Sequence, residues 1–206
     1  MKKLTCILFM LTALFVQAQT QYEKGMGKAF SLWQSGDMNG AEQLFERIAK
    51  AEANEWLPHY YIAQINSLKS WEQKDANILK AQLDKAQQHI DLAKAISPNN
   101  PEIIVMQAQV YTNWVAFDGA TYGMKYGGII SELYNKAYEI NPNNPRVVYN
   151  KAEWDMGSAR YFGKDTAPYC KDIEKSIELF ANFKPESPFH PNWGKERAEQ
   201  VLADCK

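Results

Sequence analysis

The sequence predicts an all-α solenoid of four consecutive helix pairs, followed by one further helix at the C-terminus. Three observations predict this fold. One apolar spacing typical of a helix occurs four times, a proline-rich segment recurs between helices, and no stretch alternates like a strand. With 206 residues and 46% hydrophobic residues, the chain is large enough for a real core.

The N-terminal segment MKKLTCILFMLTALFVQAQTQ differs from the rest of the chain. Lys2 and Lys3 precede an apolar run at 4–16, which is followed by a small-residue cleavage pattern that ends at Ala18. This pattern is typical of a signal peptide, and the run is shorter than the ~20 residues of a membrane span. We expect residues 1–18 to be removed, leaving one domain at 19–206 in the periplasm or outside the cell. The alternative is a first core helix, but no polar residue interrupts the run.

The segments SPNNP at 97–101 and NPNNP at 141–145 are nearly identical. Proline lacks an N–H and disfavours helix in the preceding residue, so neither segment can be a helix interior. Pro101 and Pro145 suit the first turn of a helix. Each segment is therefore expected to end one helix and begin the next.

An apolar stripe with spacings of 4, 3 and 5 residues precedes each expected stop. Spacings of 4 and 3 place residues on one helical face. The four sets are Ala41, Phe45, Ile48 and Ala53; Ala86, Ile90, Ala93 and Pro98; Ile130, Tyr134, Ala137 and Pro142; and Ile173, Ile177, Phe180 and Pro185. A small residue lies 22 positions after the first stripe residue in three units, at Ala63, Ala108 and Ala152.

These positions give the chain a resemblance to the tetratricopeptide repeat family between about residues 22 and 188. Ala29 to Ala63 spans the 34 residues of one repeat, and SGDMNGAEQLFERIAKA is similar to the family's turn and second helix. Later units depart from the family in the distance between the small residue and the stripe. This distance is 12 residues in the first unit (29–41). In the next three units it is 23, 22 and 21 residues (63–86, 108–130 and 152–173). We expect these long inserts to project from one face of the array.

The resemblance implies that the first helix of each pair lines a concave groove. It thereby implies a non-catalytic module that binds a protein or peptide of unknown identity. The candidate groove residues share one helical stripe: Met26, Phe30, Trp33, Tyr60, Gln64, Gln109, Tyr149 and Glu153. The long inserts or the first helix could instead cover this stripe.

Two glycine- and aromatic-rich inserts suggest a second function, the binding of a small molecule. FDGATYGMKYGG at 117–128 and the similar stretch at 158–164 are expected on the same edge, as packed turns or as a ligand site. The candidate cluster is Tyr122, Lys125, Tyr126, Arg160, Tyr161 and Phe162.

Two cysteines remain after the expected cleavage, and Cys170 and Cys205 are predicted to form a disulfide. A short proline-rich connection joins two helices that each span 13 residues, about 20 Å. An antiparallel pair of this kind brings Cys205 back to Cys170, although two free thiols are the alternative.

Several functions are not expected. Lys and Arg number 23 against 24 Asp and Glu, with no basic run for a nucleic acid. No known catalytic motif occurs, so the protein is not expected to be an enzyme or to hold a cofactor. His59, His89 and His190 lack the spacing of metal ligands, so no metal site is expected.

Overall fold

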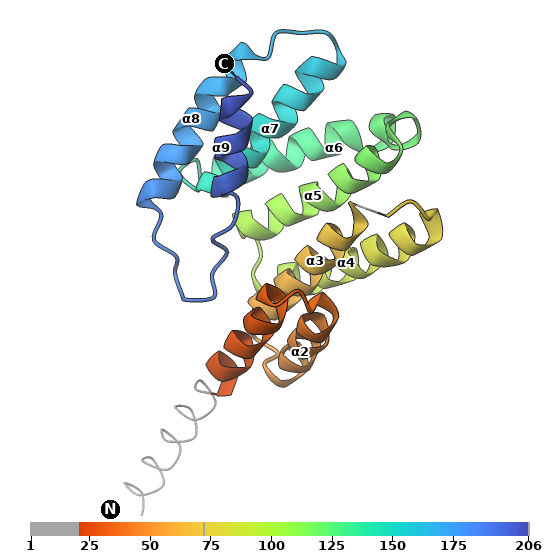
Figure 1. The fold of residues 1–206 in the computed structure, drawn as a ribbon, viewed down its shortest axis with the longest axis vertical. Coiled ribbons are helices and arrows are strands. Elements are labelled where there is room, and N and C mark those ends of the chain that lie inside the picture. Colours follow the sequence, from red (N-terminus) through yellow and green to blue (C-terminus); the bar gives the residue numbers. More distant parts are fainter. Residues whose placement is uncertain (1–20, 72, 206) are drawn as a thin grey trace, which may run out of the picture.

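The computed structural model describes residues 21–71 and 73–205, and all regular structure in this part is helical (Figure 1). The expected signal peptide therefore lies outside the described residues. A first helix includes residues 21–34. It is followed by α2 (Met38–Ala51), α3 (Trp56–Ser70), α4 (Ala76–Ile96), α5 (Pro101–Phe117), α6 (Gly119–Ile140), α7 (Pro145–Tyr161), α8 (Ala167–Asn182) and α9 (Lys195–Ala203).

The helices stack in chain order as a solenoid, which confirms the predicted fold class. Each helix packs mainly on its neighbours in the chain, with the largest contacts in the pairs α5–α6, α3–α4 and α7–α8. In Figure 1 the connections within pairs lie on the right and upper side of the view. The turns between pairs lie on the opposite side, so the array has two distinct edges.

The apolar stripes form the core, as their spacing predicts. Ala41, Phe45, Ala86, Ile130 and Ile173 are each fully buried in the helix that the sequence predicts. The small residues Ala29, Ala63, Ala108 and Ala152 are buried as well. Small side chains at these places let the backbones of neighbouring helices come close together.

The repeated proline segments are the turns between pairs. Pro101 and Pro145 are the first residues of α5 and α7. Asn100 and Asn144 cap these helices: the side-chain oxygen of Asn100 accepts from the Glu102 N–H at 2.9 Å, and that of Asn144 from the Arg146 N–H at 2.9 Å. The asparagine directly before Pro101 or Pro145 thus satisfies a backbone donor that the helix start would leave unpaired.

The long inserts are mostly helical, with a non-helical connection at 162–166 in the fourth unit, which corrects the expectation that they project as separate segments. They lengthen the helices instead: α4 has 21 residues and α6 has 22, against 14 in α2. Only Asp118 lies between α5 and α6. Its carboxylate accepts from the Thr121 N–H at 3.0 Å and caps α6.

The predicted disulfide is present between Cys170 and Cys205, with a Cα–Cα distance of 6.0 Å. It links the first turn of α8 to the residue pair that follows α9. The last helix is shorter than predicted, because it begins at Lys195 after Gly194, whose φ of +107° suits glycine. None of the described helices is both long and apolar enough to cross a membrane.

Candidate functional site

The predicted groove is filled by the chain itself. Met26, Tyr60 and Tyr149 are at most 2% exposed, so they cannot present a surface to a partner. Gln64 is buried as well, Gln109 donates to Asn150 at 2.9 Å, and Glu153 accepts from Tyr149 and Arg197. The expectation of an open groove is therefore wrong.

The segment between α8 and α9 covers this stripe. Trp193 donates from its indole N–H to the Tyr60 hydroxyl at 2.8 Å, and the Tyr61 hydroxyl donates to the Phe189 carbonyl at 2.5 Å. The Phe189 ring stacks on Phe30 with centroids 6.0 Å apart, and Phe30 lies in turn beside Trp33. The C-terminal segment thus takes the place that the prediction gave to a peptide.

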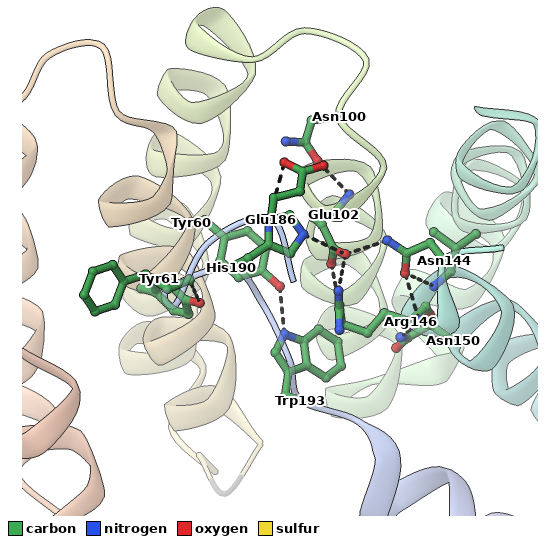
Figure 2. Close-up of polar contacts among 12 residues, drawn as sticks. Tyr60, Tyr61, Asn100, Glu102, Asn144, Arg146, Asn150, Glu186, His190 and Trp193 are labelled. Carbon is green, nitrogen blue, oxygen red and sulfur yellow. Dashed lines mark hydrogen bonds and ion pairs between the residues drawn. The ribbon is translucent and has the colours of Figure 1, made fainter. Parts of the chain in front are cut away.

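A buried polar network lies beneath the same segment (Figure 2). Arg146 donates twice to the Glu102 carboxylate, at 2.7 and 2.6 Å, and Asn144 donates to it at 2.6 Å. His190 lies 3.8 Å from a Glu102 oxygen. Burial alone would raise the pKa of Glu102, but contacts from His190, Arg146 and Asn144 outweigh it and hold this pKa below its usual value. The network is a structural joint between units.

Four aromatic rings form a ladder across α5 and α6, and two of them belong to the insert at 117–128. Trp114 lies 4.8 Å from Tyr122, Tyr122 stacks on Tyr126 at 5.9 Å, and Tyr126 stacks on Tyr111 at 4.7 Å, all between ring centroids. We call these four residues the tyrosine ladder. Its spacing follows from helix geometry, because residues three or four apart lie on one face. All four rings are partly exposed.

Glycines leave the surface beside the ladder bare. Gly119, Gly123 and Gly127 recur every four residues in α6, and a Cβ added at any of them would meet nothing within 4 Å. Tight turns therefore do not explain these glycines, which corrects the structural interpretation of this insert. Without side chains at these places, a flat molecule can approach the neighbouring rings.

The ladder carries one adjacent cation. The Lys125 ammonium lies 4.7 Å from the centroid of the Tyr126 ring. Burial and the neighbouring Tyr126 raise the pKa of Tyr111, so this phenol stays neutral near pH 7. The site therefore offers aromatic faces, hydroxyl groups and one positive charge.

The second insert lies at the end of α7 and stays separate. Tyr161 is 80% exposed and Phe162 67%, and their rings pack on each other at 5.1 Å. Arg160 and Lys164 are exposed too. Among the described residues, neither of these two rings stacks on a ring of the tyrosine ladder. The prediction of one cluster thus corresponds to two surfaces.

A cavity of about 440 Å³ opens at the same edge, between the ends of α3 and α5. Trp71 and Phe117 form part of its wall, and Trp71 is 54% exposed. Asn113 also lines it and has a buried side-chain oxygen without a hydrogen-bond partner. The edge therefore combines the ladder with an adjacent cavity that is lined by both aromatic and polar side chains.

The sequence predicts Tyr122, Lys125 and Tyr126 as site residues, but not Tyr111, Trp114 and Trp71. Tyr111 and Trp114 could have been found, because they are three residues apart and face the next helix of the same pair. Trp71 follows α3 directly and gave no such signal. Among residues 21–71 and 73–205, no group of three or more His, Cys, Asp or Glu is arranged to hold a metal ion.

Comparisons with known proteins place the fold. No protein-family model matches the chain, and a search of curated proteins finds no match. The resemblance to tetratricopeptide repeats therefore stays a resemblance. Among solved structures, the HusA haemophore from Porphyromonas gingivalis is similar with a TM-score of 0.79 and 22% identity, over 90% of this chain and 92% of that one.

This likeness shows that the two chains share a fold, and it overturns the predicted function. A module that binds a protein or peptide in its groove is wrong on two grounds. A solved structure of the same architecture is that of a haemophore, and the groove itself is covered by residues of this chain.

Proposed function

We propose that this protein is an exported, non-catalytic carrier of a flat, hydrophobic small molecule with carboxylate groups, of the haem class. The ligand binds on the tyrosine ladder. The observation that carries the proposal is the partly exposed row of four rings on α5 and α6, in a fold shared with a haemophore.

The ladder suits a planar ring system because aromatic rings stack favourably, with about 0.5–1.5 kcal/mol per pair beyond the area they bury. A macrocycle is wide enough to contact several rings at once. The bare surface at Gly119, Gly123 and Gly127 leaves room for its edge. The Lys125 ammonium is free to turn toward a carboxylate of the ligand, since it is exposed.

The donors near the ladder favour binding through the ring system over binding through iron. Haem iron is commonly held by histidine, and none of the chain's three histidines lies in α5 or α6. Tyr111 is a neutral phenol near pH 7, which is a poor ligand. The other donors on these helices include the phenols of Tyr122 and Tyr126, which belong to the ladder, and the Met124 thioether, which is 98% exposed.

Export is part of the proposal. It rests on the pattern of residues 1–18 and is supported by the disulfide between Cys170 and Cys205, a bond typical of oxidising compartments. Cell fractionation distinguishes a protein that stays in the periplasm from one that leaves the cell.

A titration of the mature protein with haem and with metal-free protoporphyrin tests the function. The absorbance of the ligand and the quenching of tryptophan fluorescence report binding. We expect saturable binding of both at comparable affinity, because the ring system makes the contacts. Absence of binding by both ligands would refute the proposed function. Binding of haem alone would refute stacking as its basis and point to a ligand such as Met124.

A further inference from the structure

We propose that His59 of α3 and His89 of α4 form a two-coordinate site for copper(I). The two rings face each other across the helix pair, and their Nδ1 atoms are 2.9 Å apart. They are 30 residues apart in the sequence, so a search for closely spaced ligands does not detect them. The site is independent of the proposed carrier function, because it uses other helices and other residues.

The two rings point directly at each other. Their centroids are 5.1 Å apart while the nitrogens are 2.9 Å apart. The centroid distance exceeds the nitrogen distance by nearly the largest amount that two imidazole rings allow. Such a difference arises only when each Nδ1 lies close to the line that joins the two centroids. The electron pairs that would bind a metal are therefore directed at one point between the rings.

This geometry selects the coordination number. The described residues offer no third His, Cys, Asp or Glu in a metal-binding arrangement, so a tetrahedral zinc site is not available. Two opposed nitrogens fit linear coordination, which suits copper(I), a cation that imidazole can bind. With metal–nitrogen bonds of about 2.0 Å, the nitrogens must separate to about 4 Å. The rings are partly exposed, so small rotations of their side chains can provide this.

The surroundings leave the imidazoles neutral and ready to bind. Burial, His59 and Lys85 lower the pKa of His89 to about 4, and burial lowers the pKa of His59. The Lys85 ammonium nearby is itself paired, with Glu42 at 2.5 Å and Glu46 at 2.6 Å. A cation that enters between the rings therefore meets no uncompensated positive charge.

The proton between the rings must move when a metal binds. In the free protein one ring donates its Nδ1–H to the other ring's Nδ1. In the metal complex both rings carry their proton on Nε2, so one proton moves from Nδ1 to Nε2 of the same ring through solvent. No net proton is released near pH 7.

Silver(I), an air-stable probe with the same preference for linear coordination, tests the site. The chain has only three histidines, so the imidazole ¹⁵N spectrum of the wild-type protein resolves each ring. One equivalent of silver(I) nitrate in chloride-free buffer should shift the Nδ1 resonances of His59 and His89 and leave those of His190 unchanged. Unshifted imidazole resonances, or a shift of only one of the two rings, would overturn the proposal.

Two variants extend the test. Removing a residue that only hydrogen-bonds to a metal ligand weakens metal binding roughly tenfold or more. Removing a ligand itself, as in His89→Gln, should therefore weaken silver(I) binding by at least that factor. Met124→Ala is the matched control, because its exposed thioether is another soft donor, and it should leave the affinity unchanged. Equal affinity in His89→Gln, or loss in Met124→Ala, would overturn the assignment. If His89→Gln does not fold, the wild-type spectrum decides alone.

Discussion

Arg146 and Glu102 form a two-point ion pair in the interior, with Nε to Oε2 at 2.7 Å and Nη2 to Oε1 at 2.6 Å. They are 0% and 1% exposed. Each follows the proline that begins its helix, so the two residues hold the same place in successive units. The repeated turn therefore positions a cation above the anion of the preceding unit and joins α5 to α7.

Replacing Glu102 by glutamine should lower the free energy of unfolding by about 3–5 kcal/mol, because it leaves the Arg146 charge buried without a partner. Urea denaturation measures this. Glu199→Gln is the control: its partner Lys195 is half exposed, and such surface pairs contribute about 1 kcal/mol or less. Equal losses in the two variants would show that the buried pair is not a joint.

The two cap asparagines should differ in their effect. Asn100→Ala removes a helix cap and should cost about 1 kcal/mol. Asn144→Ala removes the equivalent cap and also the 2.6 Å hydrogen bond to the Glu102 carboxylate, which adds about 1.5–3 kcal/mol. The midpoint of chemical unfolding should therefore fall further for Asn144→Ala. A larger loss for Asn100→Ala would contradict this account of the turn.

The disulfide should stabilise the C-terminal end. It joins residues 35 positions apart, and closing a loop of this length stabilises the folded state by about 3–4 kcal/mol in the chain-entropy model. Cys170→Ser with Cys205→Ser should show that loss in denaturant. The same loss should follow when the wild-type protein is reduced. Unchanged stability of the wild-type protein after reduction would contradict the prediction.

Acid should destabilise the protein through its histidine pair. The folded-state pKa of His89 is about 4, and that of His59 is lowered too, against about 6.5 in an unfolded chain. Between these values the unfolded chain binds more protons, so stability falls as pH drops from 6.5 toward 4. Glu102 affects stability only at lower pH. Its folded-state pKa is lowered, so its contribution to stability is complete above the unfolded-state pKa of about 4.3 and is lost as the pH falls below that value.

The melting temperature measured between pH 7 and pH 4.5 tests this dependence. We expect a decline in the wild-type protein and a smaller one in His89→Gln, which has one fewer group to protonate. The same decline in both proteins would show that other groups cause it. The neighbouring charges at this pair are Lys85, Glu42 and Glu46.

Much of the fold could be predicted from the sequence, because its signals are local. The stripe of Ala86, Ile90 and Ala93 specifies one helical face, and Pro101 and Pro145 specify where helices begin. The disulfide could be predicted because the chain reverses direction between the last two helices, although α9 is shorter than α8 and shorter than the sequence predicts. Such features need no knowledge of distant contacts.

The groove and the histidine pair could not be predicted, because they depend on residues far apart in the chain. Tyr60 is covered by Trp193, 133 residues later, and no local pattern indicates that contact. For the glycines of the first insert, the sequence leaves packed turns and a ligand site both open for another reason. Glycine is common in turns, and only the continuous helix α6 shows that here it bares a surface.

The affinity for haem in two matched double variants tests the central proposal, that the tyrosine ladder binds the ligand. Tyr122→Ala with Tyr126→Ala removes two stacking rings and should cost about 1–3 kcal/mol, or roughly 5- to 150-fold in Kd. Tyr161→Ala with Phe162→Ala removes two more exposed rings at the second insert and should leave the Kd unchanged. A folded first variant that binds haem like the wild type, or a loss of binding in the second, would contradict the account.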